Sequence, residues 1–175
     1  MTRHTSVFRN LVLTIAGAGL VIGANSFGAN ARGTPHQALP DIRLDDLEGR
    51  ATSLASFRGR IIFLNLWASW CPPCRDEMPA FQQLQDSEAS NGFVVIGVDQ
   101  GESEESVRPF LETHTITYPM FLDANETLSD AFQADQLPLT IVFDAQGRET
   151  DRLLGSRSFG ELLEELRRVR RKSSR

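Results

Sequence analysis

The 175-residue sequence is poor in the residue types that hold metals or cross-link small domains: it contains two cysteines, three histidines and three methionines. Two cysteines cannot form a framework of several disulfide bonds. A zinc site would need further ligands, and only His36 and His114 lie beyond the N-terminal segment. No methionine cluster is present to hold copper. These scarcities exclude a disulfide-stabilised scaffold and argue against a metal site.

The charge balance limits the partners further. The chain has 18 Lys and Arg against 23 Asp and Glu, a net charge of −5. Residues 167–175 contain six of the bases and no acid, so the body of the chain is acidic and its C-terminal end is basic. An acidic body argues against nucleic acid as a partner. Cations suit the C-terminal end of a helix, and contact with anionic lipid is the alternative interpretation of the basic end.

The first 31 residues are typical of an export signal. Arg3 and Arg9 precede an apolar run over residues 11–24, which is shorter than the about 20 residues of a membrane-spanning helix. Small residues around Ala31 offer a cleavage site. We therefore expect a cleaved signal peptide and a location in the periplasm. An uncleaved anchor in the inner membrane, formed by residues 11–24, is the alternative.

The remainder is predicted to be a linker over residues 32–40 and one domain over residues 41–172. Apolar residues recur with the period of strands in some segments and of helices in others. Strands are expected at 41–44, 51–54, 61–67, 93–98, 140–143 and 148–154, and helices at 72–86, 103–114, 123–134 and 158–169. Alternating strands and helices, with a hairpin near each end, predict an α/β fold whose central mixed β-sheet is flanked by helices.

The two cysteines are the main candidates for chemistry. Cys71 and Cys74 lie two residues apart, at the junction of a predicted strand and a predicted helix. A disulfide that closes so short a loop contributes little to stability, so reactivity explains the pair better. A helix N-terminus favours a thiolate. Pro72 and Pro73 lack an N–H, however, so we expect only moderate stabilisation of the Cys71 thiolate. A structural disulfide or half of a zinc site are the other interpretations.

Two segments resemble a known family. Asn65 to Pro79 resembles the active-site segment of the thioredoxin superfamily, most closely that of the TlpA/ResA-type exported thiol-disulfide oxidoreductases. Leu137 to Gly147 is similar to the cis-proline strand and hairpin of that family, and residues 94–122 fit the strand and helix inserted in this branch. The resemblance extends over residues 40–170. It implies a thioredoxin-like fold with an N-terminal β-hairpin and an inserted βα element.

The same resemblance implies roles for the acid and thiol groups. Cys71 would be the nucleophile and Cys74 the resolving thiol. Thioredoxins usually carry a buried acid where this chain has Asn65, and in the TlpA/ResA-type branch a glutamate at the position of Glu77 takes an acid–base role. The other interpretation of Glu77 is a solvated acid that favours the helix dipole.

Five further residues are expected to contact the substrate. Trp70 directly precedes the first cysteine and offers an apolar contact face, with Pro72 and Pro73 beside it. The resemblance implies a cis peptide bond between Leu137 and Pro138, which would leave the Leu137 backbone free to pair with a substrate strand. A trans proline that opens a strand is the alternative.

The resemblance finally implies an enzyme without a cofactor. It would be a monomer that reduces disulfides of exported proteins and receives electrons from a thiol carrier in the membrane. Two other functions remain open at this point. The protein could handle Cu(I) with both thiolates, or act as a thiol-dependent peroxidase. Against a peroxidase, this chain has Ala68 where peroxidases of this type carry a threonine, three residues before the reactive cysteine.

Overall fold

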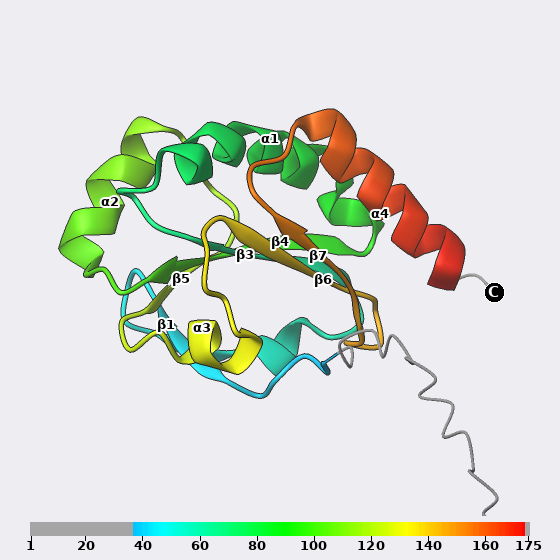
Figure 1. Ribbon diagram of the computed structural model, residues 1–175, viewed down its shortest axis with the longest axis horizontal. Coiled ribbons are helices and arrows are strands. Elements are labelled where there is room, and N and C mark those ends of the chain that lie inside the picture. The colour runs from blue at the N-terminus through cyan, green and yellow to red at the C-terminus, as the bar shows by residue number, and fades with distance from the viewer. Residues whose placement is uncertain (1–36, 174–175) are drawn as a thin grey trace, which may run out of the picture. The chain divides into compact units, whose positions relative to one another are not determined.

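The structure is a computed structural model that describes residues 37–173 (Figure 1). The expected export signal lies outside the described residues, as do most of the residues of the expected linker. The strands are β1 (Arg43–Asp46), β2 (Ala51–Ser53), β3 (Ile61–Trp67), β4 (Phe93–Gln100), β5 (Met120–Asp123), β6 (Leu139–Phe143) and β7 (Glu149–Leu154). The helices are α1 (Pro72–Glu88), α2 (Glu104–Thr113), α3 (Thr127–Phe132) and α4 (Phe159–Ser173), with short 3-10 turns η1 (Leu54–Phe57) and η2 (Ala89–Asn91).

The seven strands form one mixed sheet in the order β2-β1-β5-β4-β3-β6-β7. Parallel pairs join β3 to β4 and β4 to β5, and the other neighbours are antiparallel. Every residue of the two central strands, β3 and β4, is buried. Strands that are covered on both faces have nearly continuous apolar sequences, which is why these two were predictable. The predicted mixed sheet flanked by helices is confirmed.

Helices cover both faces of the sheet (Figure 1). Alternate residues of β3 point to opposite sides. Phe63 and Trp67 belong to the core cluster that packs under α1, α2 and α4. Leu64 and Leu66 belong to the cluster that packs against α3 and η1. The α1 side of the sheet is the one that carries the cysteines.

One strand is absent from the elements predicted above. The short strand β5 lies between α2 and α3, where the sequence suggested two successive helices. It pairs antiparallel with β1 and parallel with β4, and so connects the N-terminal hairpin to the central sheet. Only three apolar residues, Met120 to Leu122, follow Pro119. A run this short has no readable period, so tertiary pairing rather than local pattern makes it a strand.

The packed domain begins inside the expected linker. Leu39 is 1% exposed and belongs to the core cluster under α3. Its N–H donates to the Gly147 carbonyl at 2.8 Å, and Ala38 forms an isolated bridge with Arg148. The turn between β6 and β7 therefore holds the incoming chain.

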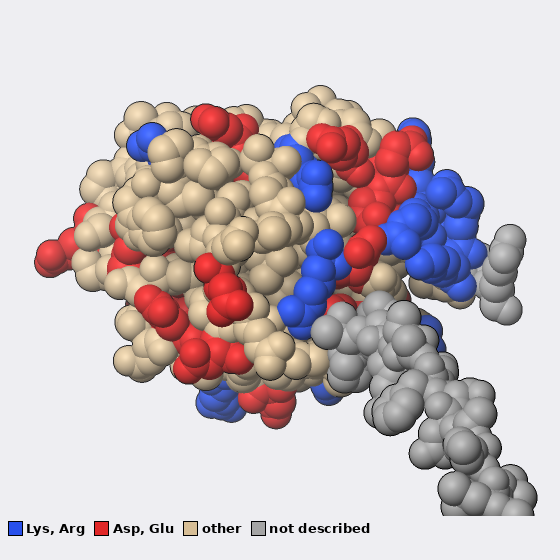
Figure 2. All heavy atoms as spheres, viewed as in Figure 1, with Lys and Arg blue, Asp and Glu red and all other residues tan. Residues whose placement is uncertain are grey.

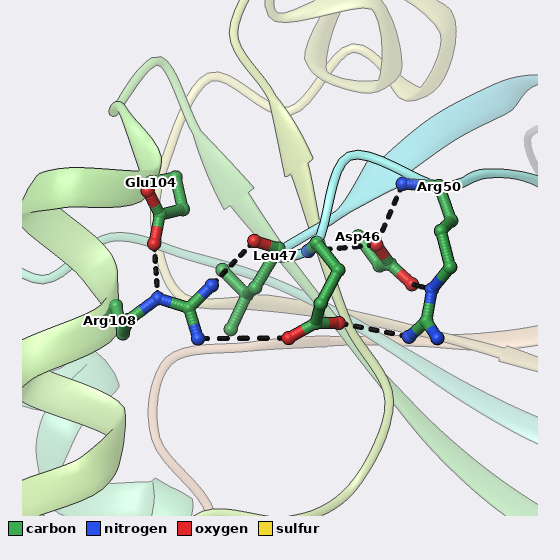
Figure 3. A network of polar contacts seen from close by, with 6 residues as sticks. Asp46, Leu47, Arg50, Glu104 and Arg108 are labelled. Atoms are coloured by element: carbon green, nitrogen blue, oxygen red, sulfur yellow. Dashed lines mark hydrogen bonds and ion pairs between the residues drawn. The ribbon is translucent and has the colours of Figure 1, made fainter.

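Polar contacts fix the N-terminal hairpin to α2 (Figure 3). Arg108 on α2 donates to the Leu47 carbonyl in the hairpin turn at 2.6 Å. The same guanidinium pairs with Glu104 one turn earlier and lies 3.7 Å from Glu48. Arg50, on the far side of the turn, pairs with Glu48 at 2.9 Å. Each exposed ion pair contributes little, but together they hold the turn against the helix.

The basic end of the chain is partly neutralised. Figure 2 shows Lys and Arg gathered over the last turns of α4, next to acidic side chains. Arg170 pairs with Glu88 of α1 at 2.8 Å, and Arg168 pairs with Glu165 at 2.6 Å. The predicted solvated helix end is thus also a site of contact with α1. Within residues 37–173 no helix has the length and apolar character needed to cross a membrane.

Gly97 tests the packing between β4 and β5. A Cβ at this position would overlap the sulfur and terminal methyl of Met120, which is buried. We expect Gly97→Ala to lower the free energy of unfolding by about 1–2 kcal/mol through overpacking. The penalty should shrink in a Met120→Ala background. Chemical denaturation measures both changes.

Gly160, in the first turn of α4, provides the matched control. A Cβ there has no neighbour within 4 Å, so Gly160→Ala should be neutral or stabilising by up to about 1 kcal/mol. Equal effects of the two alanine substitutions would contradict the packing described here.

Candidate active site

The disulfide lies where β3 gives way to α1. The strand ends at Trp67, which is fully buried, and Cys71 occupies the N-cap position of α1. Cys71 is joined to Cys74 by a disulfide bond. Cys71 is 4% exposed and Cys74 is 0% exposed. The first cysteine therefore lies nearer the surface, as a nucleophile must, and the second lies beneath it.

The start of α1 offers the sulfur few donors. Pro72 and Pro73 are its first two residues and have no N–H. The next two N–H groups, of Cys74 and Arg75, donate to the Cys71 carbonyl at 3.1 and 3.2 Å. The helix N-terminus thus acts on Cys71 mainly through its dipole, without N–H groups directed at the sulfur.

A surface hollow runs beside the disulfide. It is lined by residues 70–73, Gln100, Glu126, Ser129 and residues 134–137. Trp70 is 66% exposed, the largest exposure among the large apolar side chains of residues 37–173, and both prolines of the pair are exposed too. An exposed aromatic side chain directly next to a redox-active sulfur is suited to contact another protein.

The Leu137–Pro138 peptide bond is cis, as the family resemblance implied, and the trans alternative is wrong. Pro138 is buried and its carbonyl accepts a hydrogen bond from the Gly155 N–H at 2.9 Å. Leu137 is half-buried and lines the same hollow as Cys71. Within residues 37–173 the N–H and carbonyl of Leu137 make no backbone hydrogen bond. They are therefore available to an extended partner chain.

Glu77 is 1% exposed, so the interpretation of Glu77 as a solvated acid is wrong. It lies on α1 below the disulfide, where Asn65 of β3 donates to its Oε1 at 2.8 Å and the Arg157 N–H donates to its Oε2 at 3.2 Å. Asn65 also donates to Thr140 of β6 at 3.1 Å. Burial raises the pKa of Glu77 to about 7, although these hydrogen bonds and the charge of Arg157 act in the opposite direction.

Two further acids at the site were missed by the sequence analysis. Asp99, near the end of β4, is fully buried, and Glu102 follows it in the next turn. Glu102 accepts hydrogen bonds from the N–H and hydroxyl of Ser69, two residues before Cys71, at 2.5 and 2.6 Å. The sequence did indicate their position, because acids at the end of a buried strand lie next to the end of the neighbouring parallel strand, here the one that leads to Cys71.

No metal site accompanies the cysteines in the part of the chain that the structure describes. There, no group of three or more His, Cys, Asp or Glu side chains is arranged to hold an ion. His114 is exposed at the end of α2, where its ring nitrogen lies 2.7 Å from the Phe110 carbonyl. A cysteine pair at a helix N-terminus, which shares a hollow with the residue before a cis-proline and lies on a mixed sheet flanked by helices, defines a thioredoxin-like redox protein.

Comparison with known proteins identifies the family. The pattern of the AhpC/TSA family matches residues 35–148. The thiol-disulfide oxidoreductase ResA of Geobacillus thermodenitrificans (strain NG80-2) is 31% identical over 160 residues, which cover 91% of this chain and 92% of the relative. A thiol:disulfide interchange protein of the thioredoxin family from Chlorobium tepidum TLS has a crystal structure that is 30% identical, with a TM-score of 0.66, over 74% of this chain and 92% of the other.

Bacillus subtilis StoA shares the fold, with a TM-score of 0.62 at 24% identity over 71% of this chain and 98% of its own. The chain therefore belongs to the AhpC/TSA family. Its fold and its Cys71–Cys74 pair make it a thiol-disulfide oxidoreductase, as the resemblance implied.

The buried Glu77 predicts a specific pH dependence of stability. Its pKa is about 7 in the folded protein, against 4.5 in the unfolded chain, so the folded state binds the extra proton between these values. Proton binding by Glu77 therefore adds to the free energy of unfolding, on the order of 3 kcal/mol in all. This stabilisation is fully present below about pH 4.5 and is lost as the pH rises through about 7. Glu77→Gln should remove it, and denaturation of the oxidised protein at several pH values measures the difference.

Asp76→Asn is the matched control, because Asp76 is an exposed neighbour on the same helix. It should leave the pH dependence of the wild-type protein unchanged. If Glu77→Gln also leaves it unchanged, Glu77 ionises in its ordinary range and the burial argument fails.

Proposed function

We propose that this protein is exported to the periplasm and reduces disulfide bonds of other exported proteins through Cys71 and Cys74. The observation that carries the proposal is the placement of the pair. Cys71 lies at the edge of a hollow next to the exposed Trp70, and Cys74 is fully buried behind it. The likeness to ResA, named a thiol-disulfide oxidoreductase, supports the same reaction class.

The reaction starts from the reduced pair. The Cys71 thiolate attacks one sulfur of the substrate disulfide, whose S–S bond breaks, and the second substrate sulfur leaves as a thiolate and takes up a proton. Cys74 then loses its proton and attacks the Cys71 sulfur of the mixed disulfide. The Cys71–Cys74 bond forms and the substrate leaves as a dithiol. Two electrons pass from the protein to the substrate, and the two substrate sulfurs gain two protons.

Glu77 is suited to take the proton of Cys74. The two residues are three apart on α1 and share one face of the helix, and both are buried. A carboxyl group whose pKa is about 7 can accept a proton near neutral pH and release it again. Asn65 and the Arg157 N–H hold the carboxylate in place for this transfer.

The substrate is an extended segment of another protein. The unpaired backbone of Leu137 offers main-chain hydrogen bonds, and Trp70, Pro72 and Pro73, which line the same hollow, offer apolar contact. Pro138 fixes the position of Leu137 against the sheet.

The direction of electron flow follows from the weak support for the thiolate. Pro72 and Pro73 withhold two N–H donors from Cys71, so the reduced form gains little from ionisation. A less stabilised reduced form has a lower reduction potential and donates electrons. The oxidised pair must then be reduced by a dithiol carrier in the membrane.

A trapping experiment tests the proposal. Cys74→Ser leaves the nucleophile but removes the resolving thiol, so mixed disulfides at Cys71 should accumulate in the periplasm. Cys71→Ser is the control and should capture none. Non-reducing electrophoresis of the tagged full chain measures both. Equal capture by the two variants, or Cu(I) binding by the reduced wild-type protein with no capture, would contradict the proposal. So would a reduction potential near about −120 mV, which is that of a strong oxidant.

Trp70→Ala tests the contact face. Because the side chain is 66% exposed, its removal should leave the free energy of unfolding nearly unchanged. Loss of a central aromatic contact costs more than about 1 kcal/mol of binding, so kcat/KM for a protein disulfide should fall about fivefold or more. The rate with a small disulfide, which cannot reach across the hollow, should stay the same. Equal losses for the two substrates would place Trp70 in the chemistry instead.

A further inference from the structure

Two carboxyl groups meet at the end of β4. Asp99 is the next-to-last residue of the strand and is fully buried, while Glu102 is half-buried in the turn before α2. The Glu102 N–H donates to Asp99 Oδ1 at 3.0 Å, which folds the turn back over the strand. The reaction proposed above uses neither of these acids.

Glu102 is bound in turn to the loop that carries the nucleophile. Its Oε2 accepts the Ser69 N–H at 2.5 Å and its Oε1 accepts the Ser69 hydroxyl at 2.6 Å. Ser69 lies in the loop between β3 and α1, two residues before Cys71. Both oxygens of one carboxylate therefore hold a single residue of this loop.

The second oxygen of Asp99 has a different environment. Asp99 Oδ2 is buried, and among residues 37–173 no N–H or hydroxyl group donates to it. The Asp99 carboxyl group as a whole interacts with the side chain of Glu102. Two ionised carboxylates in contact inside a protein repel each other, and one proton held between them removes the repulsion and satisfies the bare oxygen.

We propose that Asp99 and Glu102 share one proton and that the pair positions the loop that leads into Cys71. The protonated Asp99 donates to the Glu102 carboxylate, and that carboxylate holds Ser69. Both acids are positioning residues, since they act on Cys71 through Ser69. The proposal rests on the proposed function only in giving Cys71 the role of nucleophile.

The charges around the pair agree with this assignment. Burial and the Glu102 carboxylate raise the pKa of Asp99 to about 8. Burial alone would raise the pKa of Glu102, but the hydrogen bonds from Asp99 and Ser69 lower it. At neutral pH the proton therefore belongs to Asp99 and the charge to Glu102.

Among residues 37–173, no Lys or Arg side chain acts on the charge of either acid. Asp99 lies opposite Trp67 of β3 and Leu122 of β5 in the two parallel pairings, and the ring of Phe110 on α2 packs on Trp67 at 5.5 Å. His114 stacks on the ring of Phe110, and its ring nitrogen lies 2.7 Å from the Phe110 carbonyl, so the ring is engaged away from the two acids. The carboxylate of Glu126, just before α3, lies next to Gly101 in the turn after β4 and adds a further negative charge.

A consequence follows for alkaline solutions. When Asp99 loses its proton, a second negative charge appears beside Glu102 and the hydrogen bond between them is lost. The hold on Ser69 weakens, and an attacking thiolate meets more negative charge on its way to Cys71. The rate of disulfide exchange at Cys71 should then fall at alkaline pH relative to the rate expected from thiol ionisation alone.

NMR of the full-length oxidised protein provides the first test, because its cysteines do not titrate in that state. In the wild type, the Asp99 carboxyl carbon and the Ser69 amide signal should shift together in the alkaline range. Asp99→Asn, whose amide donates to Glu102 at every pH, should abolish the alkaline shift of Ser69. Glu105→Gln, which removes an exposed acid of α2, should leave it unchanged. Titration of Asp99 in the ordinary acidic range would overturn the proposal even without the variants.

The second test compares rates of reduction of the Cys71–Cys74 bond by dithiothreitol. The ratio of the wild-type rate to the Asp99→Asn rate should be constant below neutral pH and fall several-fold in the alkaline range, where only the wild type gains a charge. A ratio that stays constant at all pH values would contradict the proposal. No substrate protein is involved, so failure of the reductase assignment would leave both results intact.

Discussion

The site depends on one constraint, the parallel pairing of β3 with β4. The two strands run side by side in register from Ile61 opposite Phe93 to Trp67 opposite Asp99. Parallel strands bring their carboxyl ends to one edge of the sheet, where ligands and reactive groups of open α/β sheets usually lie. The loop to Cys71 leaves one of these ends, and the turn with Glu102 leaves the other. The antiparallel β6 starts at the same edge, with Leu139 opposite Leu66 and Pro138 just before it.

Beneath this edge, a small polar cluster replaces apolar packing. Asn65 lies in the middle of β3, in which every residue is buried. Its amide group donates to Glu77 and to Thr140, the residue directly opposite it on the adjacent strand β6. Burial of an isolated carboxylate at this depth is costly in free energy. The hydrogen bonds offset only part of this cost, so the Glu77 carboxyl group ionises near neutral pH. An amide at position 65 donates without competing for the proton, which leaves the titration to Glu77 alone.

The sequence sufficed for the central strands, the helices that cover them and the cysteine pair, because long apolar runs and a motif with a following proline carry strong local signals. It failed for β5, whose three apolar residues become a strand only through pairing with β1 and β4. The sequence left open whether Glu77 is buried or solvated, because its burial depends on how α1 packs on the sheet. Asp99 was missed although it lies near the end of a buried strand, because its contacts with Glu102, and through Glu102 with Ser69, depend on the folded turn.

The charges around the disulfide determine what kind of redox protein this fold can be. The Glu102 carboxylate holds Ser69, two residues before Cys71, and Pro72 and Pro73 lack the N–H groups that would stabilise a thiolate there. Both effects would disfavour the ionised dithiol and so lower the reduction potential, in line with the direction of electron flow proposed above. A thiol that ionises less readily gives fewer thiolates, but each thiolate is a stronger nucleophile. In the proposed cycle, Cys74 must lose a proton in a buried site before it can attack the mixed disulfide. A carboxyl group with a pKa of about 7, one helical turn away, meets that requirement.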